Sequence, residues 1–174
     1  MIYLMKGDIM ELVNGKNIQK NFLNKLKKEM KLFKDFKEIA IISTGENLLG
    51  DAYFKAIQSM AKEMNIPLRK IHFDYISEKK LLKLIEKLNV DNRVSGILIM
   101  HPLIDEINER KIRKKICPQK DIEGLNHYYG IQNTYQELYV PCTALGIIMF
   151  LEEMHISLKN KSVLIFNRSA RIGL

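Results

Sequence analysis

The sequence predicts an α/β fold built on a parallel β-sheet. Continuously apolar runs at residues 39–44 and 96–100 are typical of buried strands, the first and third in chain order, and residues 69–73 predict a second strand between them. Between these runs, apolar residues recur at helical spacing, which predicts a helix in each connection. Strands that alternate with helices of about a dozen residues form right-handed βαβ units, whose parallel sheet is covered on both faces.

The elements before the middle strand follow from local patterns. Residues 22–33 repeat apolar side chains at helical spacing, with lysines on the opposite face, so we expect a first helix there. The run at 39–44 stops at a glycine, and residues 45–50 are expected to form a loop. A second helix is expected from Asp51, ended by Asn65 and Pro67.

The elements around the third strand are less regular. Ser77 is a plausible N-cap for a helix whose apolar residues extend to Leu88. After the third strand we expect a short helix at about residues 105–115 and then an irregular segment over residues 117–140. Such a segment is longer than ordinary connections, and segments of this length are usually functional or disordered.

The last part of the chain resembles the beginning of a second α/β unit. Pro141-Cys142-Thr143 opens a further helix, with Thr143 as the expected cap, and residues 162–166 form a strongly apolar run that predicts a strand. No crossover helix follows this strand, and a lone strand cannot pair its own backbone. The strand would join the sheet of the first unit, pair with another chain, or belong to a longer protein of which this sequence is a fragment, and we expect the last.

Composition excludes several classes of protein. The 174 residues are 47% hydrophobic and carry a net charge of +8, which is a folding composition without the long apolar run of a membrane span or a signal peptide. Two cysteines, Cys117 and Cys142, exclude a disulfide scaffold and a multi-cysteine zinc site, so we expect no metal and a cytoplasmic location. The lysine clusters lack interleaved aromatics, so we expect no nucleic-acid partner; attraction of an anionic small ligand remains open.

The fold class itself indicates where a ligand binds. In open parallel sheets, ligands lie beyond the carboxyl ends of the strands. Those ends are residues 43–50 and 100–104 in this sequence. We therefore expect the site to lie where these two loops meet.

Five segments, in order, resemble the bifunctional methylenetetrahydrofolate dehydrogenase/methenyltetrahydrofolate cyclohydrolase family. One motif would be weak evidence, but five in the same order and spacing are strong. They are the helix with the folate-stacking tyrosine (45–66), a glycine-led strand and its loop (94–103), a Pro-x-Lys-Asp-x-acid-Gly motif (118–124), the Pro-Cys-Thr helix opening (141–143) and a cofactor loop (167–173).

The resemblance implies two α/β domains with a cleft between them. Residues 1–140 would form a folate-substrate domain of the aminoacid-dehydrogenase-like type, and residues 141–174 the incomplete start of a Rossmann-like NADP domain. The family oxidises 5,10-methylenetetrahydrofolate with NADP, then hydrolyses the methenyl product to 10-formyltetrahydrofolate. It usually forms homodimers. The implied ligands are therefore a tetrahydrofolate derivative and NADP, with no metal.

The sequence departs from the family pattern at its catalytic positions. Tyr53 matches the stacking tyrosine, but Ile57 stands where the family has its catalytic lysine, one helical turn later. Met100 replaces the glutamine that hydrogen-bonds this lysine, and His101 replaces a leucine. Lys55 points to the opposite face of the helix. His101 is therefore the candidate substitute base, although a structural histidine is the simpler interpretation.

The remaining site residues follow from the same resemblance. Glu123 replaces the pterin-binding aspartate and is one methylene longer. Asp121 of the same motif, and Pro102 and Leu103 of the strand-end loop, would line the folate site. The implied NADP-binding residues are Arg168, Ser169 and Gly173.

Loss of the lysine and the glutamine together predicts an impaired enzyme. General acid–base catalysis contributes roughly 10²–10⁴-fold to a rate, so cyclohydrolase activity should be absent or very low. Hydride transfer depends more on positioning and would survive better if a complete cofactor domain were present. The alternative is a non-catalytic homologue that acts as a folate-binding or dimerisation module.

Overall fold

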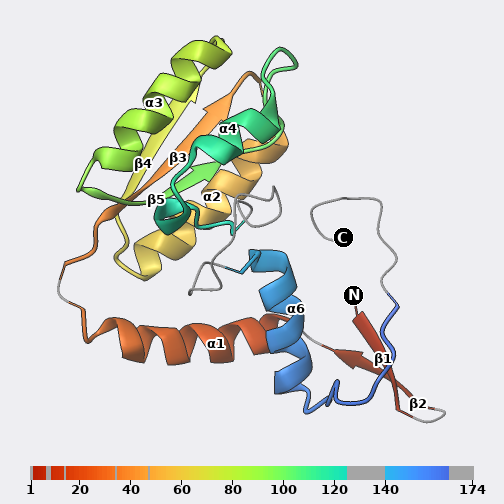
Figure 1. Ribbon diagram of the computed structural model, residues 1–174. Helices are drawn as coiled ribbons and strands as arrows, with labels where there is room; N and C mark the ends of the chain where they lie inside the picture. The colour runs from red at the N-terminus through yellow and green to blue at the C-terminus, as the bar shows by residue number, and fades with distance from the viewer. Residues whose placement is uncertain are drawn as a thin grey trace.

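The computed structural model describes most of the chain, and its backbone elements are shown in Figure 1. The described residues are 2–6, 9–13, 15–33, 35–46, 48–124 and 140–164. Their strands are β1 (Ile2–Lys6), β2 (Ile9–Val13), β3 (Glu38–Thr44), β4 (Leu68–Phe73) and β5 (Val94–Ile99). Their helices are α1 (Gly15–Met30), α2 (Leu48–Glu63), α3 (Glu78–Val90), α4 (Glu109–Lys115), the 3-10 turn η1 (Pro118–Lys120) and α6 (Cys142–Glu153).

The predicted parallel sheet is confirmed. It has three strands in the order β4-β3-β5, and β3 pairs in parallel with both neighbours. Ile41, at the middle of β3, stands opposite Lys70 of β4 on one side and Leu98 of β5 on the other. The three carboxyl ends therefore meet at one edge, as the sequence predicted.

Helices cover both faces of this sheet because successive side chains of a strand point to opposite faces. Ala40 and Ile42 of β3 pack into a core with α3 and α4, whereas Ile41, between them in the sequence, packs into a second core with Phe54 of α2. Figure 1 shows α3 and α4 on one side of the sheet and α2 on the other. Both faces are buried, as a near-continuous apolar strand requires.

Outside the sheet, α1 and α6 lie beside each other, as Figure 1 shows. Glu153 at the end of α6 accepts a hydrogen bond of 3.2 Å from Asn21 and lies 3.6 Å from the ammonium of Lys25, both on α1. β1 and β2 form an antiparallel hairpin that the sequence patterns did not predict. Among the described residues, no helix is long and apolar enough to cross a membrane.

Several element boundaries differ from the predictions. α2 begins at Leu48, inside the expected loop, and α4 begins at Glu109, where Asn108 Oδ1 accepts a hydrogen bond of 3.1 Å from the N–H of Lys111. Ser77 stands at the N-cap of α3 as predicted, but its side chain makes no capping hydrogen bond.

Two predictions near the C-terminus were wrong where the structure describes them. Thr143 is not the cap of α6, because the helix begins at Cys142 and Pro141 takes the N-cap position. The described part of the predicted strand, residues 162–164, is not a strand. Its residues Val163 and Leu164 are exposed, so within the described residues this segment lacks the packing that would order a strand. The rest of that prediction, residues 165–166, lies outside the described residues.

Candidate active site

The two loops at the carboxyl edge of the sheet are joined by a buried hydroxyl. Thr44, at the end of β3, accepts a hydrogen bond of 3.2 Å from the N–H of Ile104 through its Oγ1. Gly45 follows with a φ of 67°, and a Cβ there would lie 3.0 Å from Cγ2 of Ile104. Only glycine adopts this conformation at low cost, so the close approach of the two loops depends on it.

Ile57 and Met100 belong to the same apolar region. Met100 is 3% exposed and forms a buried cluster with Ile41, Phe54 and Leu98. Ile57 of α2 is half-buried and packs against this cluster. The two positions that the resemblance aligns with a lysine and a glutamine are therefore filled by hydrocarbon and a thioether.

Tyr53 lies one helical turn before Ile57 and remains 59% exposed. Burial of part of the ring raises the pKa of Tyr53, and the nearby charges of Glu123 and Cys142 raise it further. Partial burial and the charge of Glu123 also raise the pKa of the Cys142 thiol, which donates a hydrogen bond of 3.3 Å to the carbonyl of Ile122. Residues far apart in the sequence thus lie near enough to this exposed ring for their charges to act on it.

Sequence reasoning missed Arg113, which is the most deeply buried charge near this site. It is 1% exposed, and its Nη1 lies 2.5 Å from Oε2 of Glu123 while its Nε lies 2.7 Å from Oε1 of Glu109. The guanidinium also contacts Nε2 of His101, which is 3.0 Å from the same Glu109 oxygen. The spacing of four residues between Glu109 and Arg113 is the one signal that could have found this pair.

His101 therefore lies inside an ion-pair network. Its imidazole is shared between Arg113 and Glu109. A ring whose Nε2 is already engaged by these two side chains does not present that atom to a ligand. The arrangement supports the structural interpretation of His101 and weighs against its role as a substitute base.

The other predicted folate-site residues are divided between structural and exposed positions. Asp121 is 4% exposed and forms an isolated parallel bridge with Ile97 of β5. Leu103 packs against the core on the α3 and α4 side, whereas Pro102, after a cis peptide bond, is exposed. Of these three, Pro102 is the most open to solvent. Arg168, Ser169 and Gly173 lie outside the described residues.

A cavity of about 450 Å³ opens beside Met100 at the sheet edge. Gly50 of α2 also lines it, together with Lys70 and His72 of β4. The Lys70 ammonium is 4.6 Å from the centroid of the Phe54 ring and 3.4 Å from Asp51. His72 Nδ1 is 2.9 Å from Oγ of Ser43. Among the described residues, no group of acidic, histidine or cysteine side chains could hold a metal ion.

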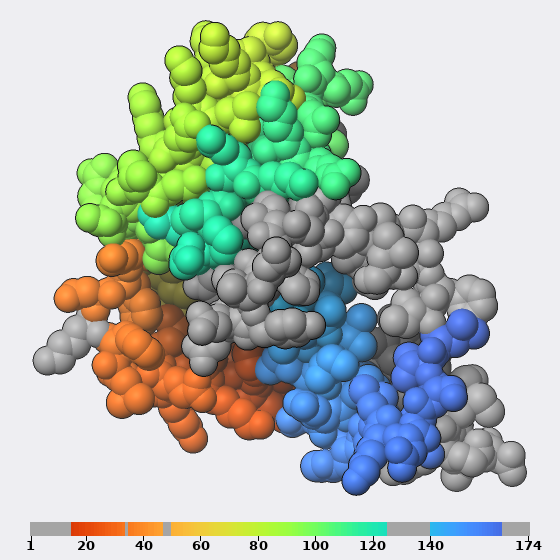
Figure 2. Space-filling model, in the orientation of Figure 1, coloured from red at the N-terminus to blue at the C-terminus, as the bar shows by residue number. Residues whose placement is uncertain are grey.

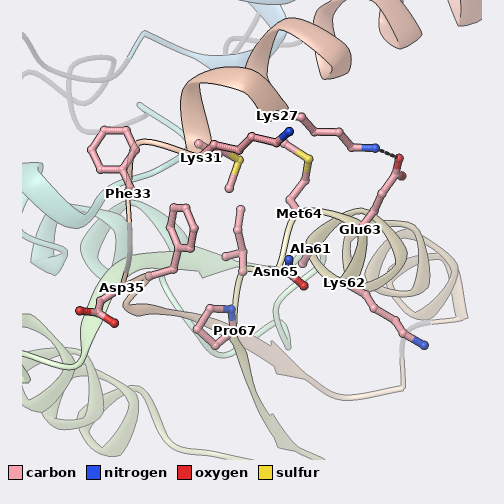
Figure 3. A pocket seen from close by; sticks show the side chains of 13 residues that line it. Lys27, Lys31, Phe33, Asp35, Ala61, Lys62, Glu63, Met64, Asn65 and Pro67 are labelled. Atoms are coloured by element: carbon pink, nitrogen blue, oxygen red, sulfur yellow. Dashed lines mark hydrogen bonds and ion pairs between the residues drawn. The ribbon is translucent and has the colours of Figure 1, made fainter.

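A second cavity, of about 880 Å³, lies away from the predicted site. Figure 3 shows it between the C-terminal parts of α1 and α2, where Lys27 pairs with Glu63. Phe33, Met64 and Pro67 contribute to its lining. None of the residues expected to bind folate lines this cavity.

The comparisons with known proteins agree with the fold and the motifs. The model of the tetrahydrofolate dehydrogenase/cyclohydrolase catalytic domain matches residues 13–123. The bifunctional protein FolD of Staphylococcus epidermidis is 30% identical over 171 residues, which cover 95% of this chain and 59% of that protein. The FolD protein of Bacillus cytotoxicus is 32% identical over 167 residues, covering 93% of this chain and 58% of that one.

Solved structures give the same result. The bifunctional enzyme FolD from Campylobacter jejuni aligns with a TM-score of 0.77 at 29% identity, covering 91% of this chain and 57% of that chain. A 5,10-methylenetetrahydrofolate dehydrogenase from the silkworm Bombyx mori aligns with a TM-score of 0.76 at 30% identity, covering 91% of this chain and 55% of that chain. The chain thus spans less than two thirds of the length of the proteins it matches. Because the family model covers more than half of the chain, this protein belongs to the tetrahydrofolate dehydrogenase/cyclohydrolase family.

Proposed function

We propose that this chain binds a tetrahydrofolate derivative and that the cyclohydrolase step of the family reaction is absent or very slow in it. One observation carries the proposal. Ile57, one turn after the exposed ring of Tyr53, packs against the apolar cluster that contains Met100. An apolar pair therefore fills the positions where a proton-transferring amine and its hydrogen-bonding amide would be expected.

The chemistry of the hydrolysis explains the impairment. Attack of water on the methenyl bridge is accelerated by a group that removes a proton from the water and returns one to the departing nitrogen. Neither an isoleucine nor a methionine side chain can hold or move a proton. His101, the nearby titratable candidate, is engaged by Arg113 and Glu109. Water can still attack, but without general acid–base help.

Folate binding depends on residues that remain. The exposed ring of Tyr53 offers a stacking surface for an aromatic ligand. Glu123 provides a carboxylate beside it that can accept N–H hydrogen bonds, and Pro102 is exposed on the loop after β5. We propose that the pteridine and aminobenzoate rings lie on Tyr53, with the pteridine N–H groups directed to Glu123.

NADP is the cofactor that the motif at residues 167–173 suggests, through Arg168, Ser169 and Gly173. Hydride transfer is chiefly a matter of positioning the folate against a nicotinamide. We therefore expect the dehydrogenase step to tolerate the changes at Ile57 and Met100 better than the hydrolysis does. We also propose residues 1–140 as the folate domain, residues 141–174 as the start of the NADP domain, and a cytoplasmic location.

The test separates the two steps. The protein is mixed with methylenetetrahydrofolate and NADP, and the absorbance of NADPH and of methenyltetrahydrofolate is followed; methenyltetrahydrofolate alone is supplied in a parallel reaction. We expect hydrolysis no faster than in buffer, together with measurable folate binding by calorimetry. Hydrolysis at a rate clearly above buffer would refute the proposed impairment, and absence of any folate binding would refute the function itself.

A second candidate, a binding or dimerisation module, is favoured by α6. This helix is apolar, yet none of its side chains is buried, and Leu145, Ile147 and Ile148 are exposed. Figure 2 shows it at the molecular surface beside α1. An exposed apolar surface of this kind commonly marks an interface. A mass measurement by light scattering, combined with the activity assay, tests it: a homodimer without turnover supports the module, and a monomer at all concentrations speaks against it.

A further inference from the structure

Two departures from the family pattern meet at one side chain. His101 replaces a leucine and Glu123 replaces an aspartate, and the two residues are 22 positions apart. Both contact the guanidinium of Arg113. The longer side chain of Glu123 therefore occurs together with a buried cation, Arg113, which its carboxylate contacts.

The position of Arg113 is enforced by its surroundings. Ile112 and Arg113 are consecutive residues of α4, and the side chains of both are fully buried. A buried guanidinium needs several acceptors, because an unpaired buried charge is very costly. Arg113 has the carboxylates of Glu109 and Glu123, and its Nη2 lies 3.4 Å from the carbonyl oxygen of Ile99.

Glu123 links the buried Arg113 to the exposed ring of Tyr53. Burial lowers the pKa of Arg113, but the charges and hydrogen bonds of Glu123 and Glu109 outweigh this, so that the net shift is upward and the cation is permanent. On the other side, Glu123 is close enough to Tyr53 and Cys142 to act on both by its charge. Arg113 engages Oε2 of Glu123; within the described chain, Oε1 has no hydrogen-bond partner.

We propose that Arg113 is a positioning residue for ligand recognition: it holds Glu123 so that one carboxylate oxygen accepts N–H hydrogen bonds from a heterocycle stacked on Tyr53. This inference rests on the proposed function, since the ligand class is a folate. The planar guanidinium forms a fork that reaches Glu109 with one nitrogen and Glu123 with another. A lysine, with a single ammonium centre, cannot hold both carboxylates in the same geometry.

A double-mutant cycle tests whether Arg113 acts through Glu123. The single variants are Arg113→Met and Glu123→Gln, the double variant combines them, and folic acid affinity is measured by calorimetry for each. We expect Arg113→Met to weaken affinity about tenfold or more, the value of one hydrogen bond to a charged group. In the Glu123→Gln background, the same substitution should change affinity by less than about twofold, within additivity error.

Two controls separate positioning from folding. Arg110→Met alters an exposed arginine on the same helix and should leave affinity unchanged. Arg113→Lys keeps the charge and replaces Arg113→Met if that variant does not fold; it should still weaken folic acid binding in the wild-type background only. p-Aminobenzoylglutamate, which lacks the pteridine, should bind all folded variants alike.

The outcomes are distinguishable. If Arg113→Met or Arg113→Lys weakens folic acid binding equally in both Glu123 backgrounds, Arg113 has a structural role alone and the inference is wrong, while the proposed function stands. If p-aminobenzoylglutamate loses as much affinity as folic acid, the effect is not directed at the heterocycle, and the inference is also wrong. If the wild-type protein binds neither compound, the proposed function itself fails.

Discussion

Gly96 of β5 lies directly against Ile122: a Cβ built on Gly96 would be 2.4 Å from Cγ2 of Ile122. Ile122 packs on the apolar cluster of Met100 and precedes Glu123 in the chain. The missing side chain at position 96 therefore sets how closely the loop with Glu123 approaches the sheet.

The first prediction follows from this contact. Gly96→Ala should lower the free energy of unfolding by about 1–3 kcal/mol, as overpacking of a core does, because Ile122 must move. The displaced loop should also weaken folic acid binding. Chemical denaturation and calorimetry measure the two effects. Gly146→Ala in α6 is the control, since a Cβ there meets nothing within 4 Å and should stabilise the helix by roughly 0.5–1 kcal/mol.

The second prediction concerns restoration of hydrolysis. The double substitution Ile57→Lys with Met100→Gln should bring back the polar pair, and with it a rate gain of roughly 10²–10⁴-fold in methenyltetrahydrofolate hydrolysis. The decay of methenyl absorbance measures it, in a chain extended by the remaining part of a family relative. Ile57→Leu with Met100→Leu is the matched control and should gain nothing. A restored pair without any rate gain would mean that α2 is aligned wrongly with the family.

The third prediction concerns the Cys142 thiol. Its pKa is raised, first by burial and then by the charge of Glu123, so a smaller fraction is thiolate at neutral pH than for an ordinary cysteine. Glu123→Gln should lower this pKa and accelerate alkylation by iodoacetamide at pH 8. The alkylation rates are compared over a pH series in a Cys117→Ser background, so that Cys142 is the one thiol that reacts. An unchanged midpoint would show that Glu123 does not act on Cys142.

The fourth prediction concerns stability at alkaline pH. The pKa of Tyr53 is raised above its ordinary value of 10.0, mainly by burial, so the folded state favours the neutral phenol. The unfolded chain therefore releases this proton at lower pH than the folded protein does. The stabilising contribution is complete below the unfolded pKa and is lost as the pH rises through the folded one. Tyr53→Phe should flatten the decline in melting temperature above about pH 10; an identical decline in both proteins would contradict this.

The sheet was predictable because its strands are marked by composition. β3 and β5 are nearly continuous apolar runs, and α3 is strongly periodic, so their bounds agree with the predictions to within about two residues. The β1–β2 hairpin was missed because five-residue strands of mixed polarity carry little pattern.

The candidate site was predictable only where motifs mark it. The grouping of Ile57 and Met100 was implied by the family resemblance, but nothing in the sequence singled out Arg113. It lies in a run of basic residues at 110–115, where the pattern gives no indication of which cation turns inward. That choice depends on the acceptors Glu109 and Glu123, which tertiary structure alone brings together.

The lysine of the Pro-x-Lys-Asp-x-acid-Gly motif has a consequence for how such sequences are interpreted. Lys120 donates hydrogen bonds of 2.8 Å to the carbonyls of Leu88 and Asp91 at the end of α3. Each carbonyl also accepts a backbone N–H, from Asp91 and from Val94 respectively, so loss of the amine would remove a second donor that ties the motif to the end of α3, whatever chemistry the protein performs. The lysine thus has a structural role that does not depend on turnover, so its presence alone is no sign that a chain with this motif is catalytically active.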